Sequence, residues 1–379
     1  MPESYDTVVI GAGIAGCCAA FTLQRQGQKV LLVDRSGMAA TGGSGAAGAF
    51  VSPKIGKGGP LQALTNEAFA YAKDFYRGHF PDYFHQTGVI RIPKDEEDAK
   101  KFSLYEPHNE ENYRWMDVAQ LRALGIKERH AGFLFEEAGV CDAPELCNAI
   151  LKEVPFQQFA VDALEYSNGS WTLLNAQHST LNAKNIVLAT GYESDLLDLR
   201  YMGIRGTWGS RGDYYSGLNL NVSMHKKISV SANIGGIIKL GATHVKSKHP
   251  CMVCDGKPLV SLEEQAAGMV DITDFVLKET FCGMRAGSKD YFPLVGRVVD
   301  VPYMEAHHPN VFRGAKPPLK HLENLYILNG VGGRGFVFAP LMAKWLAALI
   351  VEGEEVDTRV DPDRLFLKWA RKLKAEPSA

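Results

Sequence analysis

The stretch that most constrains the fold of this chain is residues 5–36, "YDTVVIGAGIAGCCAAFTLQRQGQKVLLVDRS". It begins with a short apolar run, Thr7 to Ile10, which is typical of a buried parallel strand. A G-x-G-x-x-G pattern, a helical segment and a second apolar strand ending in Asp34 follow. This order within one βαβ unit predicts a dinucleotide-binding site, and a glycine-rich turn without a ligand is the weaker alternative.

Each glycine of the pattern has a physical role. Gly11 permits the tight turn, Gly13 lets the backbone approach a pyrophosphate, and Gly16 lets the helix pack close to the strand. The helix N-terminus attracts the phosphates, and Asp34 accepts hydrogen bonds from a ribose, which disfavours a 2′-phosphate. The pattern by itself does not separate NAD from FAD.

Later glycine-rich segments favour FAD. The run "TGGSGAAGAF" (41–50) follows the ribose-binding strand directly, where it is either a flexible loop or a wrap around a longer cofactor. Residues 324–350 predict a strand, a glycine turn around Arg334 and a helix, whose N-terminus can direct N–H groups at the anionic edge of a reduced flavin. A buried strand within 182–194 ends in Ala-Thr-Gly, and such strand ends line the ligand crevice of a doubly wound sheet.

These segments predict a non-covalent FAD site. Arg285 belongs to it, because an arginine between small residues in "GMRAGSKDYFPLVG" (283–296) indicates an anionic ligand. No metal site is predicted, since the pair Cys251 and Cys254 alone cannot fill a tetrahedral zinc shell. The residues predicted to bind FAD are Gly11, Gly13, Ile14, Ala15, Gly16, Asp34, Arg35, Gly42, Gly43, Ser44, Gly45, Ala46, Thr190, Gly191, Arg285, Gly332, Gly333, Arg334, Gly335 and Phe336.

The predicted fold class is α/β: a Rossmann-like FAD-binding domain of the glutathione-reductase-like kind, with an inserted antiparallel β-rich substrate domain. Residues 226–245 alternate like antiparallel strands, and 261–278 are typical of a helix. Asp142 and Glu145 predict a capping box, and Asn168-Gly169 predicts a hairpin. The predicted boundaries are 1–87, 136–200 and 282–360 for the FAD-binding domain, 88–135 and 201–281 for the substrate domain, and 361–379 for a basic C-terminal tail.

Composition restricts the class of protein, its partners and its cellular location. Of 379 residues, 46% are apolar and 22% are charged, which is ordinary for a globular protein, and the formal charge of −2 gives no global reason to expect nucleic acid. The start "MPESYD" is unlike a signal peptide, and the apolar stretch 339–351 is shorter than the about 20 residues that span a bilayer. Seven scattered cysteines do not suggest a disulfide framework. We therefore expect a cytoplasmic protein with reduced cysteines and no membrane contact; its oligomeric state stays open.

Several of these motifs together resemble a known family. The segments "VVIGAGIAG", "GGSGAAGAF", "VLATG", "IKLGATH", "GMRAGSKDYFPLVG" and "NGVGGRGFVFAPLMAKWLA" occur in the order found in FAD-dependent amine oxidoreductases related to D-amino acid, glycine and sarcosine oxidases. The stretches "GSGAAGAFVSPKI" (43–55) and "DPDRLFLKWARKLKA" (361–375) resemble more closely the FAD-dependent half of the bifunctional tRNA 5-methylaminomethyl-2-thiouridine biosynthesis enzymes. Those enzymes also carry a methyltransferase, which this chain lacks, so the resemblance implies a stand-alone oxidoreductase.

The closer resemblance implies a substrate and a partner. The substrate is 5-carboxymethylaminomethyl(-2-thio)uridine at the wobble position of a tRNA anticodon loop, and oxidation of its secondary amine leaves 5-aminomethyl(-2-thio)uridine and releases glyoxylate. The alternative is a glycine, sarcosine or D-amino acid oxidase or dehydrogenase that acts on a free small amine. A third alternative is a flavin-containing binding or assembly protein without turnover.

The resemblance also suggests catalytic residues. Arg285 falls where the family binds the substrate carboxylate, and the alternative for Arg285 is a structural salt bridge to Asp290. Arg334 is a second candidate for the carboxylate or the flavin, and His244 is a candidate base or a satisfied core histidine. Cys282 is offset by one residue from the position of covalent flavin attachment in some sarcosine oxidases, which favours non-covalent FAD.

Basic segments are the sequence support for tRNA. The tail 361–375 contains Arg364, Lys368, Arg371, Lys372 and Lys374, with a charge of +3 after its two aspartates are subtracted, and its helix suits either a phosphate backbone or plain solvent. The segments "HKK" (225–227) and "KSKH" (246–249) are further basic positions in the inserted module. A wobble base is reachable because an anticodon loop is single-stranded.

Overall fold

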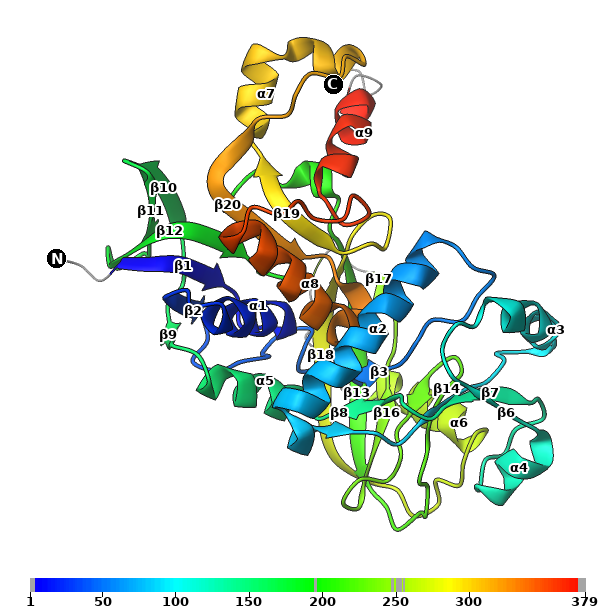
Figure 1. The fold of residues 1–379 in the computed structure, drawn as a ribbon. Coiled ribbons are helices and arrows are strands. Elements are labelled where there is room, and N and C mark those ends of the chain that lie inside the picture. Colours follow the sequence, from blue (N-terminus) through cyan, green and yellow to red (C-terminus); the bar gives the residue numbers. More distant parts are fainter. Residues whose placement is uncertain (1–3, 194–195, 247–248, 250–253, 255, 374–379) are drawn as a thin grey trace.

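Two β-sheets organise the chain, and most of the long helices lie on one of them (Figure 1). The computed structural model describes residues 4–193, 196–246, 249, 254 and 256–373. A small third sheet is formed by β3 (Phe50–Val51), β8 (Gly139–Cys141) and β4 (Phe84–His85). The predicted α/β class with an antiparallel β-rich module is confirmed.

The first sheet has eight strands among the described residues, and its centre is parallel. β1 pairs in parallel with β2 and β12, and β12 pairs in parallel with β20. The predicted hairpin is confirmed, because Ser167 and Ser170 pair across Asn168-Gly169. The strands are β1 (Ser4–Ile10), β2 (Val30–Asp34), β9 (Phe156–Gln158), β10 (Ala163–Ser167), β11 (Ser170–Leu174), β12 (Thr180–Leu188), β19 (Leu294–Val299) and β20 (His321–Asn329).

Both faces of this sheet are buried, as its continuous apolar strands require. Val9 and Leu32 point into one core, whereas Val8 and Leu31 point into the other. Four helices cover the first face: α1 (Ile14–Arg25), α2 (Pro60–His79), α5 (Ala143–Lys152) and α8 (Gly335–Val351). The β10–β11 hairpin, α7 (Val301–His307) and α9 (Asp363–Leu373) contribute to the second core.

The second sheet is almost entirely antiparallel, and its strand order among the described residues is β17-β13-β16-β15-β14-β5-β7-β6 with β18 on β13. Its core includes residues of α4 (Val118–Ala123) and α6 (Lys257–Ala267), whereas α3 (Glu96–Tyr105) lies nearer its edge (Figure 1). The strands are β5 (Val89–Arg91), β6 (Arg114–Met116), β7 (Gly132–Phe135), β13 (Arg205–Tyr215), β14 (Ser223–His225), β15 (Ser229–Val230), β16 (Ile237–Gly241), β17 (Val245–Lys246) and β18 (Val276–Gly287).

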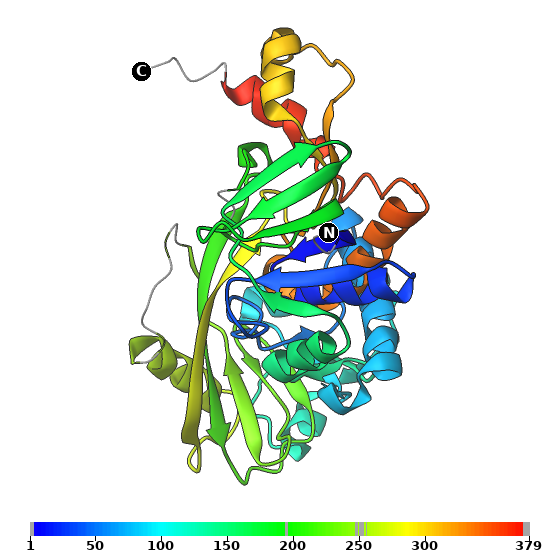
Figure 2. The same ribbon diagram turned by 90° about the vertical axis from the view of Figure 1, so that its left-hand side faces the viewer.

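The long pair β13 and β18 connects the two halves of the molecule (Figure 2). Arg285 pairs with Thr207 in this ladder, and Gly287 forms a bridge with Val331, next to the glycine turn that precedes α8. The "GMRAG" segment therefore lies against the predicted cofactor half although it belongs to the second sheet.

Two local predictions were wrong. The helix predicted over 261–278 ends at Ala267, and residues 276–278 begin β18 because β13 provides them with a pairing partner. The capping box is absent: Asp142 precedes α5, but its side chain bonds to His85 and Lys239 instead of the helix backbone. The domain boundaries and the cytoplasmic location stay predictions.

The cysteines differ from the expectation of reduced thiols. Cys254 and Cys282 form a disulfide, which joins the loop before α6 to β18, whereas Cys17, Cys18, Cys141 and Cys147 are free and buried. Cys251 lies outside the described residues. In the described part of the chain, no three His, Cys, Asp or Glu residues gather in a way that could hold a metal ion.

The apolar C-terminal segment is longer than predicted. Residues Gly332–Val351 form one helical stretch of 20 residues that is long and apolar enough to cross a membrane, instead of the 13 residues counted from the sequence. Within its most apolar 18 residues 61% are buried, and its apolar side chains pack against α1 and α2 in the first core. This burial is typical of a core helix.

Candidate active site

A cavity of about 920 Å³ is lined by residues from both large sheets. Its first wall comes from the turn after β1, the 41–50 loop, the ends of β12 and β20, and the start of α8. Its second wall comes from β5, β13, β14, β18 and the end of β16. Every residue predicted to bind FAD or substrate lines the cavity except Gly16, Gly45 and Ala46.

The turn after β1 is shaped by its glycines. Gly11 has a φ of +109°, and a Cβ there would lie 2.5 Å from the Ala189 oxygen. A Cβ on Gly16 would lie 1.8 Å from the Gly11 oxygen, so Gly16 packs the helix against the turn instead of lining the cavity. The backbone N–H of Ala12 donates to the Asp34 carboxylate at 2.8 Å, which fixes that carboxylate at the end of β2.

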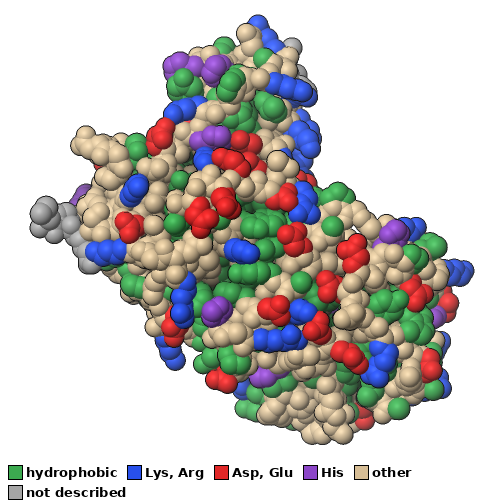
Figure 3. Space-filling view, in the orientation of Figure 1, with side chains coloured by type: hydrophobic (Ala, Val, Ile, Leu, Met, Phe, Trp, Pro, Cys, Tyr) green, Lys and Arg blue, Asp and Glu red, His purple; other side chains and the backbone are tan. Residues whose placement is uncertain are grey.

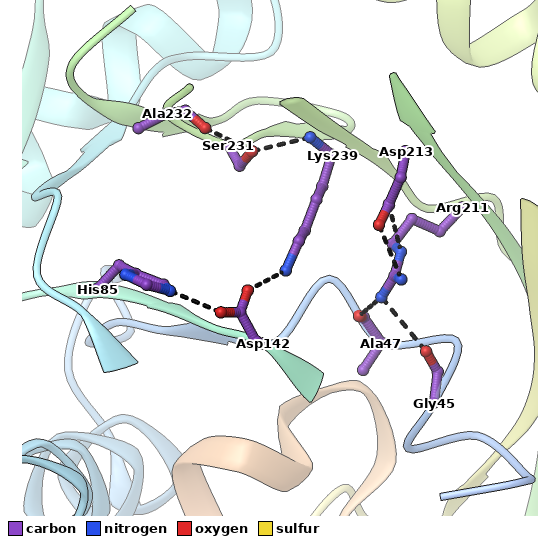
Figure 4. A network of polar contacts seen from close by, with 9 residues as sticks. All are labelled: Gly45, Ala47, His85, Asp142, Arg211, Asp213, Ser231, Ala232 and Lys239. Carbon is purple, nitrogen blue, oxygen red and sulfur yellow. Dashed lines mark hydrogen bonds and ion pairs between the residues drawn. The ribbon is translucent and has the colours of Figure 1, made fainter. Parts of the chain in front are cut away.

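The 41–50 loop is fastened to the second wall. Gly43 touches β18, because a Cβ there would lie 2.5 Å from the Met284 oxygen. Arg211 on β13 is 1% exposed and donates to the carbonyl oxygens of Gly45 and Ala47 (Figure 4). This explains why Gly45 does not line the cavity. No local sequence pattern indicated a role for Arg211, since its partners are backbone carbonyls distant in the chain.

Arg211 is itself held by a carboxylate and a ring. Its Nε lies 2.8 Å from Asp213 Oδ1, and its guanidinium lies 4.0 Å from the centre of the Phe281 ring. Burial lowers the pKa of Arg211, and the Asp213 charge opposes this shift. A buried, paired arginine therefore positions the 41–50 loop.

A second polar network joins the small third sheet to the second sheet beside this loop (Figure 4). Asp142 Oδ2 lies 2.7 Å from His85 Nε2, and Asp142 Oδ1 accepts a hydrogen bond from Lys239 Nζ at 2.6 Å. Burial acts to raise the pKa of Asp142, but the hydrogen bond to His85 and the Lys239 charge together outweigh it and lower the pKa to about 2. The network ties β4, α5 and β16 together.

Arg285 lies half-buried on β18 at the cavity wall. Its Nη1 donates to the Thr243 oxygen at 3.1 Å, and a Cβ on Gly209 would lie 2.3 Å from its Nη2, so Gly209 leaves room for the guanidinium. The alternative of a salt bridge to Asp290 is wrong, because Asp290 pairs with Arg364 at 3.0 Å. Among the described residues no carboxylate forms an ion pair with Arg285, and burial lowers its pKa.

The other two catalytic candidates also line the cavity. His244 is exposed at its rim and so is not a core histidine; partial desolvation and the Arg285 charge lower its pKa, which keeps it neutral at pH 7. Arg334 lies half-buried in the short 3₁₀ turn Gly332–Arg334 just before α8, and its Nη1 donates to the Ser52 oxygen at 3.4 Å. Arg35, a predicted FAD-binding residue, is exposed and forms an ion pair with Glu193.

The wall residues fit a flavin dinucleotide. The start of α8 has no side-chain cap and no acidic residue in its first turn, so its N–H groups suit an electron-rich ligand edge. Thr190 Oγ1 and Trp208 Nε1 are buried polar atoms without a hydrogen-bond partner in the described structure, and both residues line the cavity. Such atoms are normally satisfied by a ligand or water.

Comparison with known proteins decides the family. Residues 6–349 match the family described as FAD dependent oxidoreductase. This chain belongs to that family. FAD is its cofactor, as the glycine patterns predict, and the protein is an FAD-dependent oxidoreductase. Non-covalent binding of the FAD stays a prediction. The nearby Cys282 is disulfide-bonded to Cys254.

Similar curated proteins are bifunctional tRNA enzymes. The tRNA 5-methylaminomethyl-2-thiouridine biosynthesis bifunctional protein MnmC of Magnetococcus marinus is 24% identical over 97% of this chain. The protein of the same name from Shewanella amazonensis is 25% identical over 98%. The chain spans only about 60% of the length of these relatives.

Solved structures of amine and amino acid oxidases share the fold. Glycine oxidase from Bacillus cereus superposes with a TM-score of 0.76 at 20% identity, and the match covers 93% of this chain and 96% of the oxidase. Iminodiacetate oxidase from Chelativorans gives a TM-score of 0.75 at 17% identity, covering 94% and 98%. This FAD-dependent oxidoreductase therefore has the fold of these oxidases over nearly its whole length.

Proposed function

We propose that this oxidoreductase removes the carboxymethyl group of 5-carboxymethylaminomethyl(-2-thio)uridine at the tRNA wobble position. The observation that carries the proposal is Arg285, a half-buried guanidinium at the cavity wall that pairs with no carboxylate among the described residues. The relatives are named for synthesis of a modified tRNA uridine, and two solved neighbours are named for glycine and iminodiacetate. Both of those amines carry a carboxymethyl arm.

The reaction class follows from the substrate. The chemistry that bound FAD supplies is acceptance of two electrons and a hydrogen from the CH–NH unit, which leaves a C=N bond. Water then adds to that bond and splits it into glyoxylate and the primary amine of 5-aminomethyl(-2-thio)uridine. Arg285 would hold the arm carboxylate by a bidentate contact, which fixes the carbon that loses its hydrogen.

The remaining wall residues have separate roles in this proposal. The amine must lose its proton before oxidation, and neutral His244, next to Arg285, can accept it. Gly11 and Gly13 would admit the FAD pyrophosphate, and Asp34 the ribose. The start of α8 would face the flavin ring.

The surface beside the cavity offers a place for the tRNA backbone. Tyr291 lines the cavity mouth and is 72% exposed. Lys289, Arg205, Lys368 and Lys372 are exposed nearby, and Lys289 has a pKa lowered by Lys372, Arg205 and Lys368, so these cations crowd together. Figure 3 shows Lys and Arg side chains along the edge where α9 lies, whereas charges of both signs mix elsewhere on that face. A run of exposed cations suits phosphates.

One cation of the predicted basic tail forms contacts within the protein. Arg364 is engaged with Asp290 and with the carbonyl oxygens of Phe292 and Pro293, so it anchors α9 and does not face solvent freely. Lys374 lies outside the described residues. Lys368, Arg371 and Lys372 are the exposed cations of α9 that remain for the backbone.

The test is incubation of the FAD-loaded protein with tRNA that carries 5-carboxymethylaminomethyluridine, followed by nucleoside mass analysis. We expect 5-aminomethyluridine and glyoxylate in equal amounts. Arg285→Leu should lower turnover by roughly 10²-fold while FAD stays bound, since about 3 kcal/mol is the upper range for hydrogen bonds to a charged group, and a bidentate contact makes two. Arg285→Lys keeps the charge without the fork and should lose roughly tenfold.

The alternative is an oxidase for free glycine, sarcosine or D-amino acids, which the shared fold of glycine oxidase favours. Rapid oxidation of one of these amines, with the tRNA nucleoside unchanged, would establish it. Loss of activity in Arg285→Leu would then still assign the carboxylate to Arg285, but for a small substrate.

A further inference from the structure

A group of basic side chains lies in the active-site cavity in addition to Arg285. Lys54, Arg91, His225, Lys227 and Arg334 all line the cavity, and we call them the basic cluster. They come from four separate places in the chain: the loop after β3, the end of β5, the end of β14 with the residues after it, and the turn before α8. The fold therefore assembles the cluster from distant segments.

Strand register places the two central members side by side. Arg91 and His225 are directly paired in the parallel β5–β14 ladder, so their side chains emerge on the same face of the sheet. The next residue, Lys226, is directed elsewhere, because its ammonium group lies 2.9 Å from both carboxylate oxygens of Glu128. Arg91 and His225 therefore both line the cavity, whereas Lys226, which pairs with Glu128, does not.

Three members of the basic cluster form no ion pair among the described residues. In the described part of the chain, no carboxylate forms an ion pair with Lys54, Arg91 or Arg334; Arg334 has only the Ser52 oxygen at 3.4 Å. Burial together with Arg334, Arg91 and Lys94 lowers the pKa of Lys54 to about 8. Burial and Arg334 also lower the pKa of Arg91, against the opposing charge of Asp98. Half-buried like charges without partners destabilise a fold, which is typical of a functional site.

Arg285 comes from a different part of the cavity wall than the basic cluster. It lies on β18, which supplies no member of the cluster. The turn before α8 lies next to it, because a Cβ on Gly333 would be 3.7 Å from Arg285 Cδ. One cavity thus holds more cationic side chains than a single carboxylate requires.

We propose that the basic cluster binds a second anionic group of the substrate, separate from the carboxylate that Arg285 holds. This inference rests on the proposed function, in which the second group is a phosphate of the modified nucleotide. Guanidinium groups match phosphate oxygens bidentately, and a lysine adds a point charge. A dicarboxylic amine such as iminodiacetate carries the same kind of charge on its second arm, whereas glycine has no group for the cluster.

The test measures binding to the FAD-loaded protein through the flavin absorbance spectrum, without turnover. The probes are uridine 5′-monophosphate, uridine, inorganic phosphate and iminodiacetate. We expect the monophosphate to bind at least roughly tenfold more tightly than uridine, and Arg91→Met and Lys54→Met to remove that difference, since each removes a charge-assisted contact. Lys57→Met, which removes an exposed lysine that does not line the cavity, is the matched control and should change nothing.

The outcomes separate the two proposals. If iminodiacetate binding depends on Arg91 and uridine 5′-monophosphate does not bind, the second anion is a carboxylate. The tRNA proposal is then wrong, whereas the anion-binding role of the basic cluster is supported. If both variants convert modified tRNA with unchanged KM and bind the monophosphate normally, the basic cluster has no substrate role. If the variants instead lose FAD or shift its midpoint potential at unchanged probe binding, the cations serve the flavin and the inference is overturned.

Discussion

The two walls of the cavity use opposite kinds of chemistry. The first wall consists largely of glycines and backbone, including Gly11, Gly13, Gly43 and Gly335. The second wall carries charged side chains on β-strands, among them Arg91 and Arg285. The first wall recognises its ligand by close approach and N–H groups, and the second by charge.

This difference predicts how substitutions in each wall should act. Where backbone atoms are in contact, an added methyl group has no space, and the ligand should be lost altogether. Where unpaired cations are half-buried, removing one should weaken substrate binding while it relieves repulsion in the protein. The following variants test that contrast, from the largest expected effect to the smallest.

Gly16→Ala should abolish FAD binding, because its Cβ would meet the Gly11 oxygen at 1.8 Å and both groups are backbone-bound. The measurement is the flavin-to-protein ratio after purification in excess FAD. Gly78→Ala in α2 is the control, since no atom lies within 4 Å of its added Cβ. Retention of FAD at the native ratio in Gly16→Ala would show that this wall tolerates displacement.

Gly209→Ala should keep FAD and lower the rate of flavin reduction by roughly 10²-fold, because its Cβ would displace the Arg285 guanidinium and misplacement by about 1 Å has that cost. Anaerobic single-turnover kinetics measure it. An unchanged rate would mean that the position of Arg285 does not matter for the reaction.

Asp142→Asn should destabilise the protein at pH 7 by about 2 kcal/mol or more, since an aspartate pKa near 2 lies well below the usual value of about 4. A lowered pKa contributes stability above pH 4 that is lost as the pH falls toward 2. Denaturant unfolding at several pH values should therefore show a flatter acid dependence for Asp142→Asn. Asp82→Asn, at an exposed position, should keep the native profile.

The lowered pKa of Lys54 predicts that substrate binding, measured as KM, depends on pH. With a pKa of about 8, Lys54 is protonated below pH 8 and loses its charge above it, so KM should rise several-fold between pH 7 and pH 9. Lys54→Arg should remove this rise, because a guanidinium stays charged. A KM that rises equally in both proteins would assign the titration to another group.

The same contrast explains what could be predicted from the sequence. The turn at Gly11 to Gly16 and the hairpin at Asn168-Gly169 depend on neighbours in the chain, so local patterns revealed them. The capping box predicted at Asp142 was wrong because its carboxylate bonds to His85 and Lys239, which are distant in sequence. A helix was wrongly extended to residue 278 because pairing with β13 outweighed local preference.

The basic cluster was missed for a related reason. Arg91 stands as a lone charge in the apolar run "GVIRIP", which was a usable signal, but Lys54 and Arg334 meet it only through tertiary structure. The disulfide between Cys254 and Cys282 likewise depends on where the loop before α6 meets β18. Sequence patterns thus revealed the backbone wall and Arg285, whereas the fold was needed to bring the other charged residues together.

The central claim is that Arg285 holds a carboxymethylamine for oxidation by the bound flavin. Its most direct test is anaerobic mixing of the oxidised protein with tRNA that carries 5-carboxymethylaminomethyluridine, while the flavin absorbance is followed. The account predicts rapid bleaching with one glyoxylate released per flavin reduced, and bleaching roughly 10²-fold slower in Arg285→Leu. Bleaching at the same rate in Arg285→Leu, or no bleaching in the native protein, would contradict it.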